Sequence, residues 1–134
     1  MASYRELLAQ VKSEIAEVAT TDARALLGEG GPLFLDVREP EEWHEGHIPG
    51  AVHISRGNLE SRVEAIVPDK GREIVIYCAG GARSAFAAKS LTELGYQHVS
   101  SMAGGFADWK RNGYDFELPR ALSPEQRARY SRHI

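Results

Sequence analysis

A single cysteine, Cys78, is the residue in this chain with the clearest potential for chemistry. It stands in IVIYCAGGARSAFAAKSL, where an apolar run ends at the cysteine and a Gly-Gly pair and an arginine lead into a helical pattern. A thiolate is a strong nucleophile, and its pKa falls to roughly 3.5–7.5 beside a helix N-terminus or backbone N–H groups. Gly80 and Gly81 allow the backbone to turn such groups inward as an anion-binding nest. The segment predicts an activated thiolate held by the amides of residues 79–83.

The alternative is that Cys78 is a small buried hydrophobe whose reactivity is never used. One cysteine cannot form an internal disulfide, so the thiol is either inert packing or a reacting group. The glycines, Arg83 and the helix start favour the reacting group. A mechanism with a second, resolving cysteine in the same chain is excluded.

The composition is that of an ordinary globular domain. The chain has 134 residues, 43% of them apolar, with 16 Lys and Arg against 19 Asp and Glu. This mild negative charge argues against a general nucleic-acid binder. No apolar run reaches the roughly 18 residues of a membrane span, and the opening is too charged for a signal peptide. We therefore expect a cytoplasmic protein without a membrane segment.

Strand and helix patterns alternate along the chain. One face of an expected amphipathic helix is formed by Tyr4, Leu7, Leu8, Val11, Ile15 and Val18. Thr20 or Thr21 is expected to cap a second helix. Strands are expected over 33–37, within 47–54, over 73–78 and over 96–102, and helices from Pro40 and over 57–67, 83–94 and 106–113. This alternation predicts an α/β fold with a mostly parallel sheet and helices on both faces. Ligands of such sheets gather at the carboxyl ends of the strands, where Cys78 falls.

The segment CAGGARS resembles the active-site loop of the rhodanese-like sulfurtransferases, which opens with a cysteine and has glycine fourth and arginine sixth. LDVRE, GHIPGAVHI and GGFADWKRNG resemble the other signatures of that family, in the expected order. The resemblance implies a rhodanese-like fold with five strands over residues 17–118, preceded by the helix of residues 1–16 and followed by a tail of residues 119–134.

The resemblance also implies a ping-pong transfer of sulfane sulfur that needs no cofactor. A donor, either thiosulfate or a protein persulfide, loads Cys78 as a persulfide, and a thiophilic acceptor removes the sulfur. The anion loop is then formed by residues that follow the cysteine: Ala79, Gly80, Gly81, Ala82 and Arg83. Arg83 is expected to stabilise the loop or to contact the substrate.

Three further residues are expected to support the site. Asp36 ends the first apolar strand, and the resemblance implies that it fixes the framework by pairing with an arginine. Arg38 follows it without an assigned catalytic role. His47 is expected to hydrogen-bond within the GHIPGA turn. His44 and His47 have a spacing that suits two metal ligands on a helix, but no third ligand follows, so we expect no metal.

Two other functions remain open at this point. Cysteine phosphatases and arsenate reductases also hold an anion between a strand and a helix, but the phosphatases place five residues between cysteine and arginine. Only four lie between Cys78 and Arg83, which favours a single sulfur over a tetrahedral phosphate. The other function is a non-catalytic interaction module, which would not need the cysteine and its glycines.

The tail of the chain has a resemblance of its own. LSPEQRARYSRHI, residues 122–134, resembles the opening of the adenylyltransferases that activate small sulfur-carrier proteins in molybdopterin and thiamin synthesis. This implies a fusion in which a persulfide on Cys78 supplies sulfur to an adenylated carrier at high effective concentration. The alternative is a basic amphipathic helix that packs on the domain.

Overall fold

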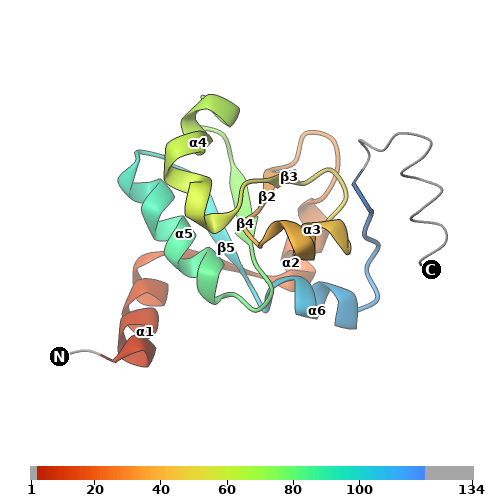
Figure 1. Ribbon diagram of the computed structural model, residues 1–134, viewed down its shortest axis with the longest axis horizontal. Helices are drawn as coiled ribbons and strands as arrows, with labels where there is room; N and C mark the ends of the chain where they lie inside the picture. Colours follow the sequence, from red (N-terminus) through yellow and green to blue (C-terminus); the bar gives the residue numbers. More distant parts are fainter. Residues whose placement is uncertain (1–2, 120–134) are drawn as a thin grey trace.

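The computed structural model describes residues 3–119, and within them the chain folds around one five-stranded sheet (Figure 1). The strand order is β1-β5-β4-β2-β3, and every pairing is parallel. The strands are β1 (Ala16–Ala19), β2 (Leu33–Asp36), β3 (Val52–His53), β4 (Ile74–Tyr77) and β5 (Val99–Ala103). The predicted α/β class is confirmed, with a sheet that is parallel throughout.

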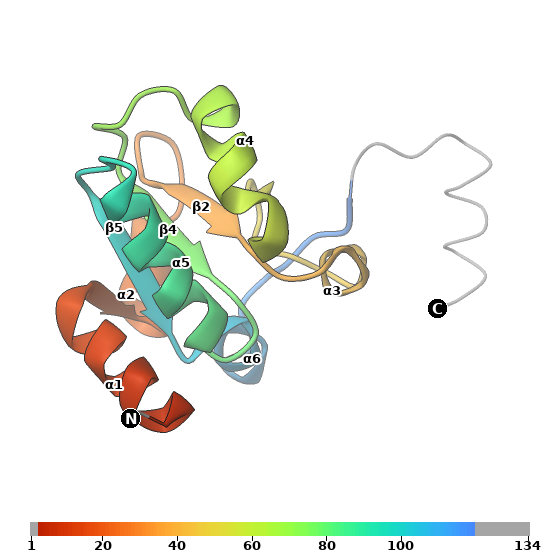
Figure 2. The same ribbon diagram turned by 60° about the vertical axis from the view of Figure 1, so that its left-hand side comes forward.

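Six α-helices and one short 3₁₀ helix are present in the described residues. They are α1 (Tyr4–Glu14), α2 (Thr20–Leu26), α3 (Pro40–His44), η1 (Arg56–Asn58), α4 (Leu59–Ile66), α5 (Ala82–Glu93) and α6 (Gly105–Arg111). Helices α4 and α5 cover one face of the sheet with α1 beside α5, and α2 and α6 cover the other (Figures 1 and 2).

The central strand β4 explains this two-sided burial. All four of its residues are buried; Ile74 and Ile76 pack in the cluster under α4 and α5, whereas Val75 and Tyr77 pack with α2 and α6. Successive side chains of a strand point to opposite faces, so a continuous apolar run is what a strand covered by two helical layers requires. Cys78 follows directly and lies on the α5 side.

The prediction of one helical stripe from Tyr4 to Val18 is wrong at its end. Helix α1 stops at Glu14, and Ala16–Ala19 form the edge strand β1, which pairs with Ser100–Ala103. The two last members of the stripe pack on different layers, Ile15 in the α4–α5 cluster and Val18 in the α2–α6 cluster. Pairing with β5 therefore overrides the helical periodicity.

The predicted threonine cap of the second helix is also wrong. The N-cap of α2 is Ala19, and no side chain caps it. Thr20 is the first helical residue, and its hydroxyl donates to the carbonyl of Ala103 at 2.8 Å. The hydroxyl therefore ties the start of α2 to the end of β5.

No helix among residues 3–119 combines the length and the apolar character that crossing a bilayer requires. The adenylyltransferase-like segment at 122–134 lies outside the described residues.

Two apolar side chains of α4 differ sharply in burial. Leu59 is 0% exposed and Ile66 is 46% exposed. We expect Leu59→Ala to lower the free energy of unfolding by about 2–5 kcal/mol, because it leaves a cavity in the core. Ile66→Ala should change it by no more than roughly 0.5 kcal/mol. Urea unfolding measures both, and equal losses would contradict the packing described for α4.

Candidate active site

Cys78 stands directly after β4, and three loop residues separate it from α5. The cysteine is 1% exposed, whereas Gly80 in the loop is exposed. Gly81 is the N-cap of α5 with φ at +107°, a left-handed conformation that L side chains rarely adopt. The loop can therefore reverse direction and lead into the helix within three residues.

The first turn of α6 fixes the other side of this loop. The amide of Phe106 donates to the carbonyl of Cys78 at 2.8 Å, and that of Ala107 donates to the carbonyl of Ala79 at 3.0 Å. A Cβ added to Gly105 would lie 2.5 Å from the Ala79 oxygen, so only glycine lets α6 come this close. With these two carbonyls bonded to α6, the N–H groups that follow are available to the sulfur.

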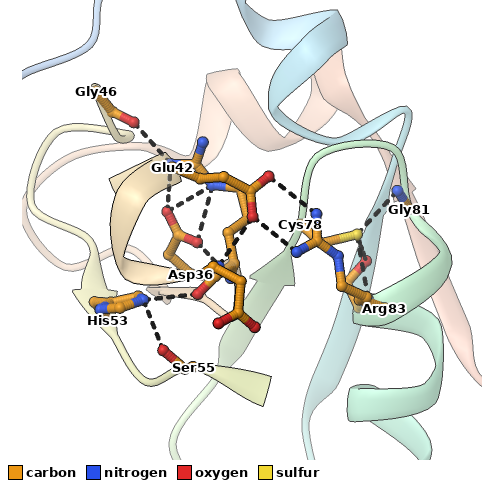
Figure 3. A network of polar contacts seen from close by, with 11 residues as sticks. Asp36, Glu42, Gly46, His53, Ser55, Cys78, Gly81 and Arg83 are labelled. Atoms are coloured by element: carbon orange, nitrogen blue, oxygen red, sulfur yellow. Dashed lines mark hydrogen bonds and ion pairs between the residues drawn. The ribbon is translucent and has the colours of Figure 1, made fainter. Parts of the chain in front are cut away.

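The thiol sulfur is surrounded by hydrogen-bond donors. Its Sγ accepts from the amide of Gly81 at 3.1 Å (Figure 3). It also accepts from the amide of Ser84 at 3.3 Å, and the Ser84 hydroxyl lies 3.5 Å away. The Ser84 hydroxyl in turn lies 2.8 Å from that of Ser101 on β5, and both serines are fully buried.

These donors decide the charge of the thiol. Burial alone would raise the pKa of Cys78, but the hydroxyl and amide of Ser84 and the amides of Gly81 and Gly80 outweigh it and lower the pKa below its ordinary value. A hydrogen bond to the charged form stabilises that form, and the low dielectric of a buried site strengthens the bond. The arrangement favours a thiolate, the nucleophilic form of cysteine.

The donor set differs in part from the predicted amides of residues 79–83. Gly80 and Gly81 belong to that set, and Ser84 lies outside it. Within the described residues no hydrogen bond joins Sγ to the amides of Ala79, Ala82 or Arg83. The sequence did contain a signal for Ser84, because a residue in the first turn of a helix directs its free N–H back toward the preceding loop.

Arg83 does not fold over the sulfur in this structure. Its guanidinium forms a bidentate pair with Glu42 of α3, with Nη1–Oε1 at 2.8 Å and Nη2–Oε2 at 3.1 Å (Figure 3). The carboxylate raises the pKa of Arg83, and Arg83 lowers the pKa of Glu42. No local pattern in the chain indicates this contact, because 41 residues separate the partners.

Asp36 and Arg38 form a buried framework beside the loop. Arg38 Nη2 lies 2.7 Å from an Asp36 oxygen and also donates to the carbonyl of Gly46 at 2.7 Å. Burial alone would lower the pKa of Arg38, but Asp36 raises it. The guanidinium carbon lies 4.4 Å from the centre of the Phe106 ring on α6. Arg38 therefore joins the end of β2 to the turn before β3 and to α6.

His47 lies in that turn and away from the cysteine loop. Its Nδ1 lies 3.0 Å from the carbonyl of Ile48, and its ring stacks on Trp43 with centroids 3.6 Å apart. Its backbone pairs with Glu117 in an isolated bridge. Residues 3–119 contain no group of three or more His, Cys, Asp or Glu residues that could hold a metal ion.

Comparisons with known proteins give a consistent picture. Residues 19–112 match the model of the rhodanese-like domain family. The chain is 39% identical over 75 residues to the thiosulfate sulfurtransferase PspE of Escherichia coli, covering 56% of this chain and 71% of that protein. It is 41% identical over 76 residues to the putative sulfur carrier protein YrkF of Bacillus subtilis, covering 57% of this chain but 40% of that protein.

A solved structure from Rhodopseudomonas palustris is similar over most of its length. It is described as a protein of unknown function and possible tyrosine phosphatase. The superposition has a TM-score of 0.80 at 33% sequence identity and covers 87% of this chain and 96% of that chain.

The Ser84 hydroxyl should lower the pKa of Cys78 measurably. In Ser84→Ala a buried sulfur anion loses one donor, so the pKa rises and the ratio of thiolate to thiol at any given pH falls about three- to tenfold. The ultraviolet absorbance of the thiolate, followed against pH, measures this on the only cysteine of the chain. Ser90→Ala, at the other end of α5, is the matched control and should leave the midpoint unchanged. Equal midpoints in Ser84→Ala and the wild type would show that the hydroxyl does not act on the sulfur.

Proposed function

Because the chain belongs to the rhodanese-like family, we propose that Cys78 carries sulfane sulfur as a persulfide between a donor and a thiophilic acceptor. The chain is a sulfurtransferase with a single, buried cysteine at its active site. The observation that carries the proposal is the set of donors around Sγ, with Gly81 N at 3.1 Å and Ser84 N at 3.3 Å. Such donors stabilise a negative sulfur before and after the transfer.

The loading step with thiosulfate is a displacement at sulfur. The Cys78 thiolate attacks the sulfane sulfur, a new S–S bond forms, and the bond to the sulfonate group breaks with its electron pair leaving as sulfite. The outer sulfur of the persulfide now carries the charge. An acceptor such as cyanide then takes that sulfur and restores the thiolate. No step changes the number of protons on the protein.

The anion loop has a separate part in this proposal. The outer sulfur of a persulfide stands one bond beyond Sγ, so it reaches other N–H groups than the thiolate does. We assign the binding of the outer sulfur to the remaining amides of residues 79–83, while Gly81 and Ser84 continue to donate to Sγ, the inner sulfur. Asp36, Arg38 and His47 then keep the surrounding turns in place without touching the reacting sulfur.

For donor and acceptor we propose two chemical classes. PspE is a thiosulfate sulfurtransferase, which makes thiosulfate the first donor to test. YrkF is described as a putative sulfur carrier protein, which favours a carrier as acceptor. The resemblance of residues 122–134 to carrier-activating adenylyltransferases favours the same acceptor, a sulfur-carrier protein that a fused domain would adenylate. A tethered persulfide would act there at high effective concentration.

Phosphatase activity is the second candidate, because the Rhodopseudomonas palustris protein is described as a possible tyrosine phosphatase. A phosphatase of this kind needs its arginine to bind the phosphate oxygens. Here the arginine is engaged by Glu42, with both nitrogens within 3.1 Å of the carboxylate. The loop is also one residue shorter than in the phosphatases. Both features favour sulfur transfer.

Intact-mass measurement tests the proposed function. After incubation with thiosulfate, the wild type should gain the mass of one sulfur atom, and cyanide should remove it with release of thiocyanate. Cys78→Ser should gain nothing, because its hydroxyl does not form a persulfide. Absence of a cyanide-labile sulfur with thiosulfate and with a persulfide donor, together with hydrolysis of an aryl phosphate, would replace sulfur transfer by phosphatase chemistry.

A further inference from the structure

The ion pair between Arg83 and Glu42 stands at the rim of the cysteine loop. Arg83 lies in the first turn of α5, whereas Glu42 comes from α3 (Figure 3). The two side chains are 37% and 33% exposed, so both are partly open to solvent. Both groups are therefore accessible to a charged donor that binds at the loop.

Glu42 is held in place independently of Arg83. As the third residue of α3 it accepts a hydrogen bond from the amide of Glu39 at 2.9 Å, closing a capping box. The positive charge of Arg38 also lowers the pKa of Glu42. Arg83 is the main cause that lowers the pKa of Glu42, and the contact with Glu39 orients the carboxylate from its own helix as well.

Arg83 and Cys78 interact electrically. Arg83 is the second residue of α5, the helix that follows the cysteine loop, and after Glu42 the negative sulfur also contributes to raising the pKa of Arg83. A free guanidinium there would attract an anion to a site that already holds a thiolate. Paired with Glu42, the same group contributes almost no net charge, and its two terminal nitrogens are turned to the carboxylate.

We propose that Glu42 is a specificity-determining residue. Because it pairs with the Arg83 guanidinium, that group does not bind small dianions, and the site favours sulfane donors of lower charge. This inference rests on the proposed transfer of sulfur through Cys78. Donors of lower charge include persulfides, in which one negative charge resides on the transferred sulfur. Thiosulfate, with two charges, is used but is penalised.

Two donors that release their sulfur in the same way measure this selectivity. Thiosulfate is a dianion that leaves as sulfite, and methanethiosulfonate is a monoanion that leaves as methanesulfinate. In each the Cys78 thiolate attacks the sulfane sulfur, and the bond to the oxidised sulfur breaks with its electron pair leaving on that sulfur. The readout is the ratio of kcat/KM for thiosulfate to that for methanethiosulfonate, with cyanide as acceptor.

Glu42→Gln should release Arg83 and raise this ratio. We expect kcat/KM to rise about tenfold for thiosulfate and about threefold for methanethiosulfonate, because the attraction scales with the charge of the donor. Glu41→Gln removes an equal charge from α3 at a residue that pairs with no described group, and it should leave the ratio unchanged. An equal rise in both variants would overturn the inference, because long-range charge alone would then explain it.

Arg83→Gln removes the other member of the pair, so it tests the inference in the opposite direction. Its result does not depend on whether Glu42→Gln folds. It leaves the Glu42 carboxylate unpaired, so the ratio should fall about threefold. The double variant restores a neutral rim and should return the ratio to the wild-type value. A role of Arg83 in loop stability alone would lower both rates together and leave the ratio unmoved, which would sink the inference. Failure of the wild type to accept sulfur from either donor would instead sink the proposed function.

Discussion

Holding a negatively charged sulfur inside a folded domain is the constraint on which this structure depends. A buried charge without hydrogen-bond partners is costly enough that the group would bind a proton instead. Peptide units provide partners only if their N–H groups turn inward, and then their carbonyls must be bonded elsewhere. Here the first turn of α6 bonds these carbonyls, because the amides of Phe106 and Ala107 donate to the carbonyls of Cys78 and Ala79. The sulfur therefore depends on a helix that never touches it.

The parallel sheet brings these parts to one edge. Strands β2, β4 and β5 are neighbours that run in the same direction. Asp36 at the end of β2, Cys78 after β4 and the Gly104–Gly105 turn after β5 therefore lie at the same edge of the sheet. Arg38 links this edge from within, since it bonds Asp36 and Gly46 and lies over the Phe106 ring. A change at Arg38 would therefore reach the cysteine loop through the Phe106 ring and the hydrogen bond from the Phe106 amide to Cys78.

The sequence predicted those features that depend on local pattern. The buried run Ile74–Tyr77, the cysteine at its end and the helix after Gly81 were all recognisable, because burial on both faces and a left-handed glycine leave marks in the chain itself. Strand β1 and the role of Thr20 were missed because both come from pairing with β5, some 83 residues away in the case of Thr20. The contacts of Ser84 with Ser101 and of Arg83 with Glu42 were missed for a similar reason, because each joins residues far apart in the chain. Periodicity carries no information about partners that only the tertiary fold brings together.

The two arginine–carboxylate pairs near the site show why its charge can be adjusted at one of them and not at the other. Arg38 and Asp36 have side chains 5% and 0% exposed, and removing one partner of such a buried pair costs about 3–5 kcal/mol. Arg83 and Glu42 are 37% and 33% exposed, so the loss of that pair costs about 0–1 kcal/mol. A domain of ordinary stability tolerates the second loss but not easily the first. The charge at the rim can therefore change without loss of the fold, while the framework that positions the cysteine stays fixed.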